Sequence, residues 1–298
     1  MNKSFTLIEI LVVIVIVGVL SAFILVGMSS ITTSANFAKG KAFFNSMDNS
    51  LLLARVSQWK LDEASGITAY DSWGTNDGTR TDATGACDAT HCPQIQTTGC
   101  PSGNCLSFDG TNDYVSTNSG WDSSLSTTLT ISAWVKITGG IQGVVLGQNT
   151  AIPPRKFLFY VSNTNRPSFQ WSLDGGGTNV DVSFANIIDT NWQNIVVTFN
   201  NGVVVFYTNG VVSGGKTSLI TSIEGTAGGL RIGRDLWSGF YYSGLIDDVR
   251  IYKQAIPTSQ IKQNYFIVLN KLFKNKGTTL NEFNQRIVEL KSSLVNNR

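Results

Sequence analysis

The clearest structural signal in this sequence is the stretch NWQNIVVTFNNGVVVFYTNGVV, residues 191–212. It contains two Asn-Gly pairs, each lying between runs of Val, Ile, Phe and Tyr. Asn-Gly is a strong signal for a tight hairpin turn, because both residue types adopt the positive φ values that such turns need. The stretch therefore predicts a meander of three antiparallel strands, with turns at Asn201-Gly202 and Asn209-Gly210.

A second stretch, TTLTISAWVKI at residues 127–137, alternates between apolar and mostly polar positions. A period of two is typical of a strand that turns one face toward a core. The predicted core face carries Leu129, Ile131, Ala133, Val135 and Ile137. Many short strands of this kind, with no helical pattern between them, predict a mainly β fold, a sandwich or jelly roll over residues 57–257.

The composition excludes several classes of function. The chain has 298 residues, a formal net charge of +2 and only 14% charged residues, without a basic cluster that would indicate a nucleic-acid partner. The single histidine, His91, argues against a Ser/His or Cys/His nucleophile. The E-x-D-x-x-E pattern that presents the paired carboxylates of jelly-roll glycosidases is absent from the sequence. We therefore expect a protein that is not an enzyme.

The N-terminus contains KSFTLIEILVVIVIVGVLSAFILVGM, residues 3–28, in which residues 10–28 carry no charge. As a helix this uncharged run would be about 28 Å long, close to the roughly 30 Å of a bilayer core. The run is too long for a secretory signal peptide and no clean cleavage site follows it. An ordinary membrane anchor fits the run but leaves Glu9 without a partner charge, which is costly in lipid.

The same residues resemble the processing site and N-terminal helix of type IV pilins and pseudopilins. The resemblance implies that a prepilin peptidase removes residues 1–4 by cutting between Ser4 and Phe5, and that the new amine of Phe5 is methylated. It implies that Glu9 pairs with the N-terminal amine of a neighbouring subunit during filament assembly. Ser4 departs from the glycine that is usual before the cut. We expect one helix over residues 5–56, with about residues 7–28 spanning the membrane.

Phrases farther along the chain resemble, in order, the blocks of the laminin-G-like, concanavalin-A-type jelly roll. They are WKLDEASGITAYDSWGTNDGT, CLSFDGTNDYV, LTISAWVKI, NWQNIVVTFNNGVVVFYTNGV, LRIG and GLIDDVRIYKQAI. The resemblance implies a domain that binds carbohydrate or protein. Because sugars stack on exposed aromatic rings, Trp237, Tyr241 and Trp171 are the expected ligand-binding residues, with Phe240 or Tyr242 in the core.

A structural calcium ion is a further expectation. Alternation along LIDDVRIY places four residues on one face: Leu245, Asp247, Val249 and Ile251. One acid would then point toward apolar neighbours, which is costly unless it is paired or bound to a metal. The family resemblance implies that Asp71, Asp77 and Asp247 hold Ca²⁺ through oxygen ligands. The alternative is an Asp247 that is satisfied by backbone N–H groups, by Arg250 or by Arg234.

All four cysteines lie in one segment, as the two units CDATHC and CPSGNC. Four cysteines allow three pairings, and a zinc site that includes His91 is an alternative. An exported chain favours disulfides. Related surface jelly rolls have a short local bridge before the LSFDG strand, and this resemblance implies the pairs Cys87–Cys92 and Cys100–Cys105.

The C-terminal tail, residues 258–298, contains an amphipathic pattern at spacings of three and four. Its apolar positions are Leu280, Phe283, Ile287, Leu290 and Leu294. Thr279 with Glu282 reads as a capping box at the start of the helix. The predicted helix could fold back on the domain or on the N-terminal pilin-like helix, or it could engage a partner.

Together the two resemblances imply a single-pass precursor in the cytoplasmic membrane that is processed and then assembled into a surface filament. Its partners would be the prepilin peptidase, the membrane and other pilin subunits, and glycans or another cell's surface would bind the displayed head. A minor adhesive pilin is the expected role. A structural major pilin without a ligand, and a pseudopilin of a secretion or DNA-uptake system, are the alternatives.

Overall fold

The structure, a computed structural model, describes most of the chain from Ala54 onward. The described ranges are 54–82, 84–85, 87–88, 91–120, 125–138, 143–148, 157–172, 179–183, 189–223, 229–235 and 239–295. The leader, the helix expected over residues 5–56 as far as residue 53, and the sites Ser4, Phe5 and Glu9 lie outside these ranges.

Eight strands form sheet A, in the order β14-β13-β12-β7-β16-β5-β4, with β1 also paired to β16. Their bounds are β1 Arg55–Trp59, β4 Gln94–Gln96, β5 Cys105–Asp109, β7 Thr128–Ile137, β12 Gln193–Asn200, β13 Val203–Thr208, β14 Val211–Thr217 and β16 Ser243–Tyr252. All pairings in this sheet are antiparallel. The predicted helix end at residue 56 is wrong, because Arg55 and Val56 belong to β1, where Arg55 pairs with Tyr252.

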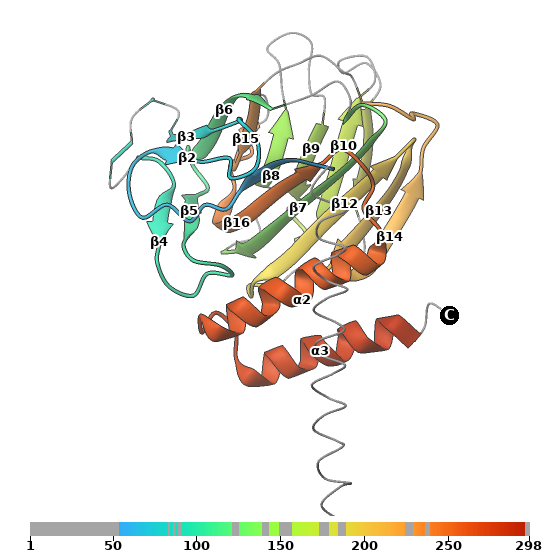
Figure 1. Cartoon of the computed structure of the whole chain (residues 1–298). Coiled ribbons are helices and arrows are strands. Elements are labelled where there is room, and N and C mark those ends of the chain that lie inside the picture. Colours follow the sequence, from blue (N-terminus) through green and yellow to red (C-terminus); the bar gives the residue numbers. More distant parts are fainter. Residues whose placement is uncertain are drawn as a thin grey trace, which may run out of the picture. The chain divides into compact units, whose positions relative to one another are not determined.

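Eight further strands form sheet B, in the order β11-β10-β9-β8-β15-β6-β3-β2. Their bounds are β2 Thr68–Ala69, β3 Gly78–Thr81, β6 Tyr114–Gly120, β8 Gly143–Gln148, β9 Phe157–Val161, β10 Pro167–Ser172, β11 Asn179–Ser183 and β15 Gly229–Ile232. Figure 1 shows the two sheets of the sandwich. The predicted mainly β sandwich is confirmed.

The core lies between the inner faces of the two sheets. The predicted face of β7 is buried there in full: Leu129, Ile131, Ala133, Val135 and Ile137. Sheet B contributes large aromatic side chains, of which Phe159, Phe169 and Trp171 are fully buried. The predicted meander is also confirmed as β12-β13-β14, and Asn201 and Asn209 have φ values of 47° and 52° at the two turns.

The prediction that Asp247 shares a face with Val249 and Ile251 is wrong. The register of β16 against β7 shifts between Asp247 and Arg250, and Asp248 has a φ of 49°. An extra residue of this kind, a β-bulge, interrupts the alternation of the strand. Val249 and Ile251 consequently enter the core, whereas Asp247 accepts a hydrogen bond from the loop residue Ser102.

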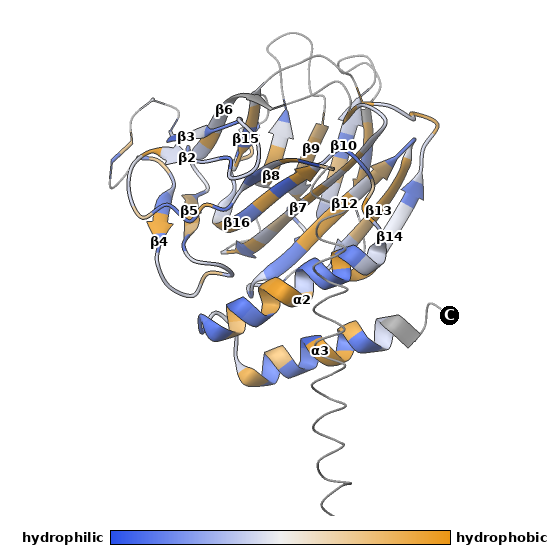
Figure 2. Ribbon diagram, in the orientation of Figure 1, coloured by the Kyte–Doolittle hydropathy of each residue, from blue (hydrophilic) through white to orange (hydrophobic). Residues whose placement is uncertain are grey.

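Two C-terminal helices, α2 Thr258–Lys274 and α3 Leu280–Val295, cover the outer face of sheet A. The ring of Tyr265 in α2 stacks on Trp134 of β7 at 5.5 Å, and Leu269 and Leu272 are buried in the same cluster. Figure 1 shows α2 against the sheet and α3 beyond it, and Figure 2 shows orange apolar positions interleaved with blue polar ones along both helices. The tail therefore folds back on the domain, with two helices where one was predicted.

The predicted capping interaction at α3 is present in part. Thr279 Oγ1 accepts a hydrogen bond from the backbone N–H of Glu282 at 3.2 Å, while the Glu282 side chain binds Arg286 instead of returning to the cap. Phe283 and Ile287 pack on the cluster under α2, and Leu290 is buried in it. Neither helix in this described portion is long and apolar enough to cross a membrane.

Candidate glycan-binding surface

Because α2 and α3 cover sheet A, the outer face of sheet B is the sheet face that the helices leave open. Alternation along β6 and β15 decides which side chains reach this face. Val115 and Ile232 are buried in the core, so their neighbours Tyr114 and Arg231 point outward and are half-buried. β6 and β15 are paired, with Ile232 opposite Val115, and this register brings Tyr114 and Arg231 together across the strands.

The segment after β15 adds two more residues to this surface. The positive φ of Gly233, 89°, turns the chain at the end of the strand. Tyr242 anchors the returning chain, since it is fully buried edge-on against Phe108 at 6.2 Å and donates its N–H to the Gly233 carbonyl at 2.8 Å. Arg234 and Tyr241 are thereby held near each other beside β6.

The four residues Tyr241, Arg234, Tyr114 and Arg231 form a stack, called here the Arg–Tyr ladder. The Arg234 guanidinium lies 4.9 Å from the ring centres of both Tyr114 and Tyr241. The Arg231 guanidinium lies 5.4 Å from the ring centre of Tyr114. Aromatic rings and fixed cations alternate along this surface, which combines stacking area with hydrogen-bond donors.

The ladder contains two cations, Arg231 and Arg234. Burial lowers the pKa of Arg231, Tyr114 raises it, and the neighbouring Arg234 guanidinium lowers it. The Arg234 Nε donates to the backbone carbonyl of Asp235 at 2.9 Å. Within the described ranges, neither Arg231 nor Arg234 forms an ion pair with a carboxylate. The surface is therefore positively charged.

The three predicted ligand-binding residues differ in where they lie. Tyr241 is half-buried in the ladder, with Arg234 over its ring. Trp171 is fully buried in the core beside Phe169 and donates its Nε1–H to the Ile220 carbonyl, so its prediction as a ligand platform is wrong. Trp171 lies two residues after Phe169 in β10, so both side chains point to the core, and this alternation was the signal in the sequence that could have placed Trp171 there. Trp237 lies outside the described residues.

The remaining aromatic positions of this segment agree with the sequence analysis in part. Tyr242 lies in the core, in agreement with the expectation that either Phe240 or Tyr242 would be buried there. Phe240 packs on a separate outer cluster of sheet B formed by Val144, Leu158 and Tyr160. The sequence analysis missed Tyr114, Arg231 and Arg234, although the alternation of their strands was visible in DYV and LRIG.

The three predicted calcium ligands do not form one site. The Asp71 carboxylate accepts backbone N–H groups through both oxygens, including that of Gln58 at 2.9 Å, and Asp77 Oδ1 accepts the N–H of Asp71 at 2.8 Å. Asp247 is buried elsewhere, under the loop that contains Ser102. No group of three acidic, His or Cys side chains able to hold a metal ion occurs in the part of the chain that the structure describes. The residues present do not fit the expected ion.

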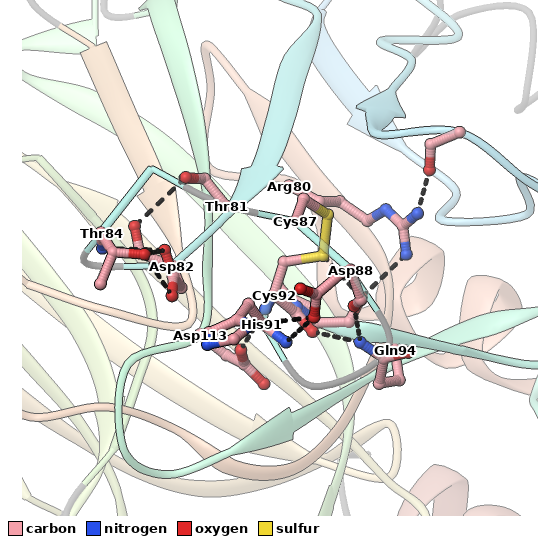
Figure 3. The surroundings of a disulfide bond; sticks show 12 residues. Arg80, Thr81, Asp82, Thr84, Cys87, Asp88, His91, Cys92, Gln94 and Asp113 are labelled. Atoms are coloured by element: carbon pink, nitrogen blue, oxygen red, sulfur yellow. Dashed lines mark hydrogen bonds and ion pairs between the residues drawn. A yellow bond between two sulfur atoms is a disulfide. The ribbon is translucent and has the colours of Figure 1, made fainter.

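Both cysteine pairs form local disulfides, Cys87–Cys92 and Cys100–Cys105. Figure 3 shows the first bridge, with His91 turned to Asp88. All four sulfurs are used in these bonds, which removes the thiolates that a zinc site with His91 would need. Cys100–Cys105 is buried in the cluster beneath α2.

The fold and its open face define a class of protein, the jelly-roll binding domain, and the comparisons with known proteins agree. Residues 109–262 match the family described as the concanavalin A-like lectin/glucanases superfamily, and the chain belongs to this superfamily. Residues 1–25 match the prokaryotic N-terminal methylation motif, so the chain carries the type IV pilin signature at its N-terminus. No curated protein matches the chain.

Solved structures with the same fold share little sequence with it. The binding domain of Paraclostridial Mosquitocidal Protein 1 is 14% identical, with a TM-score of 0.56, over 74% of this chain and 53% of that domain. The binding domain of botulinum neurotoxin serotype D is 13% identical, with the same score and coverage. Domain 4 of AbnA, an extracellular arabinanase of Geobacillus stearothermophilus, is 18% identical, with a TM-score of 0.51, over 70% of this chain and 97% of that domain.

Because their sequence identities to this chain are low, these solved structures show only that the fold is shared. The chain spans about half of the toxin domains it matches. The two toxin neighbours are binding domains, and the N-terminal match is a methylation motif, not a catalytic one.

Proposed function

We propose that this chain is a subunit of a type IV pilus-like filament whose jelly-roll head binds glycans, and that it is a minor, adhesive subunit. The observation that carries the proposal is the joining of a methylation motif at residues 1–25 to a concanavalin A-like domain. The Arg–Tyr ladder lies on the sheet B side of this domain, which the described helices α2 and α3 do not cover. The motif supplies membrane insertion, processing and assembly. The domain supplies a recognition surface on the finished filament.

The structural neighbours support a carbohydrate ligand by analogy of fold. The AbnA domain was solved in complex with arabinotriose, so a jelly roll of this shape can present a sugar-binding surface. In the present chain, Tyr114 and Tyr241 are half-buried beside Arg234, and partly exposed aromatic side chains are the type that sugar rings contact.

A glycan-array assay on filaments sheared from cells tests the proposal, with the Tyr241→Ala variant beside the parent. Loss of one stacking ring should weaken binding by roughly 2–10-fold. Tyr70→Ala is the matched control, because Tyr70 is an exposed tyrosine, 58% accessible, remote in sequence from the ladder. An equal loss in both variants would show that the ladder is not the binding surface.

The same filaments separate the adhesive subunit from its alternatives. Low abundance of the chain relative to the main filament protein, together with glycan binding, supports the minor adhesive role. High abundance without binding of any glycan would favour a structural major pilin. Incorporation into a short periplasmic structure, without surface exposure, would favour a pseudopilin.

A further inference from the structure

The Arg–Tyr ladder gathers positive charge that nearby acids leave uncompensated. Two guanidinium groups, of Arg231 and Arg234, lie over the single ring of Tyr114. The acid closest to them in sequence is Asp235, yet it raises the pKa of Arg231 less than Arg234 lowers it. Two like charges on one ring repel each other, so an arrangement of this kind is stabilised when an anion binds between or beside them.

The ladder also has hydrogen-bond donors that are not used. Within the described part of the molecule, Arg234 donates only through Nε, to the Asp235 carbonyl, so its two terminal nitrogens make no hydrogen bond. Arg231 Nη1 also has no hydrogen-bond partner, but it is buried away from the surface. A guanidinium presents parallel N–H donors that match the two oxygens of a carboxylate or sulfate. The terminal nitrogens of Arg234 are therefore of the type that recognises such anions.

The ring faces add a requirement that a simple inorganic ion does not meet. The ring centres of Tyr241 and Tyr114 each lie 4.9 Å from the Arg234 guanidinium. The ring area that the guanidinium groups leave uncovered offers apolar contact for the C–H face of a sugar, while the Arg234 guanidinium beside it addresses a charged substituent on the same sugar ring. A ligand that satisfies both is a sugar ring that carries an anionic group.

We infer that the ladder binds acidic glycans, whose sugars carry carboxylate or sulfate groups, in preference to neutral ones. This inference rests on the proposed function, since it names the glycan class taken by the same surface. Arg234 makes the main contact with the anion, Arg231 supports it, and the rings of Tyr114 and Tyr241 hold the sugar.

Two matched pairs of probes test the inference on the full chain in sheared filaments: oligogalacturonate against its methyl ester, and a heparin oligosaccharide against its desulfated form. We expect oligogalacturonate to bind at least about tenfold more tightly than its neutral methyl ester if the ladder recognises carboxylates, and heparin to bind at least about tenfold more tightly than its desulfated form, which keeps its carboxylates, if the ladder recognises sulfates. Arg234→Gln should remove most of this preference, and affinity for the charged probe should fall as salt rises. Binding of oligogalacturonate alone identifies a carboxylate ligand, and binding of heparin alone identifies a sulfate ligand.

Lys216→Gln is the matched control, because it removes one exposed positive charge from β14 of the other sheet. An equal loss of binding in Lys216→Gln and Arg234→Gln would overturn the inference, since general charge attraction would explain it. Equal binding of the charged and neutral probes would overturn the inference while leaving the proposed glycan-binding function intact. Failure of every charged and neutral glycan to bind would overturn the proposed function itself.

Discussion

Asp247 and Asp248 are neighbours in β16 and both are buried, yet their carboxylates lie in opposite environments. Asp248 forms an ion pair with Arg250 and accepts a hydrogen bond of 2.8 Å from Nε2 of Gln58. Asp247 accepts one hydrogen bond, from the backbone N–H of Ser102 at 3.1 Å, and its Oδ1 has no partner in the described structure. Burial raises the pKa of Asp247 well above its usual range, whereas Arg250 and Gln58 outweigh burial and lower the pKa of Asp248.

We expect Asp247→Asn to gain stability relative to the parent as pH rises. The unfolded carboxyl ionises near its ordinary pKa, while folded Asp247 keeps its proton to higher pH. Its contribution to stability is therefore complete below the unfolded pKa and is lost as pH rises toward the folded pKa. Neutral Asn has no such loss. Thermal unfolding between about pH 4 and about pH 8 should show the Tm difference, variant minus parent, rising by about 2 °C or more.

Glu289→Gln is the control for this titration, because Glu289 is an exposed carboxylate on α3. Its Tm difference from the parent should change little over the same pH range. A Tm difference for Asp247→Asn that stays constant with pH would contradict a buried carboxyl that holds its proton.

The environment of Asp247 also shows where sequence patterns stop being sufficient. The alternation of LIDDVRIY predicted a regular strand, and the strand exists, but a bulge at Asp248 changed the faces of all the residues after it. Nothing in the local pattern indicates a bulge, because its position depends on the partner strands. β1 pairs with β16 after the bulge, at Val249, and β5 pairs with it before, at Ile246.

Local signals were reliable where the structure depends on neighbours in the sequence. The Asn201-Gly202 and Asn209-Gly210 turns were predictable because Asn and Gly readily adopt the positive φ values that these turns need. The ladder was not predictable in this way, since Tyr114 and Arg231 meet only through the pairing of β6 with β15. Such contacts depend on tertiary structure.

Asp71 should be a major determinant of stability in the loop before β3. Its Oδ1 accepts the N–H groups of Gln58, Trp73 and Gly74 at 2.9, 3.1 and 2.9 Å, and its Oδ2 accepts that of Asn76 at 3.2 Å. We expect Asp71→Ala to lower the free energy of unfolding by about 3 kcal/mol, because one buried and three partly buried donors lose a charged acceptor. Urea unfolding measures this loss.

Asp77→Ala provides the comparison, since Asp77 accepts one backbone N–H, that of Asp71. Its cost should be nearer 1 kcal/mol. Costs in the reverse order would show that the backbone hydrogen bonds of Asp71 do not organise the loop.

Calcium should have little effect on the stability of the parent. Both oxygens of Asp71 are occupied by backbone N–H groups, and Asp247 lies apart from it under Ser102. We expect the Tm with added Ca²⁺ and with chelator to agree within about 1 °C, because a ligand stabilises a protein only when it binds the folded state. A clearly higher Tm with Ca²⁺ would restore the calcium site that the family resemblance implied.

The two disulfides should contribute unequally. Both bridges join residues five apart, so closing the loops restricts the unfolded chain equally, by roughly 2 kcal/mol each. Cys100 and Cys105 are also fully buried in the cluster under α2, and removing both sulfurs leaves space there. We expect the Cys100→Ala/Cys105→Ala variant to lose about 1–2 kcal/mol more than Cys87→Ala/Cys92→Ala in urea unfolding. Equal losses would show that the buried bridge adds nothing to packing.

Glu9 should determine filament assembly without affecting the earlier steps. It lies in the methylation motif of residues 1–25, where the pilin resemblance pairs its carboxylate with the amine of a neighbouring Phe5. Glu9→Ala and the neutral isostere Glu9→Gln should both insert into the membrane and be cut after Ser4, because neither change touches the apolar run or the cleavage site. Both should enter sheared filaments about tenfold less than the parent, since loss of about 1.4 kcal/mol of pairing changes an equilibrium by that factor. Glu9→Asp keeps the charge and should retain more incorporation than Glu9→Gln. Normal incorporation of Glu9→Gln, measured by immunoblot of filaments against membranes, would show that pairing of charges between subunits is not what drives assembly.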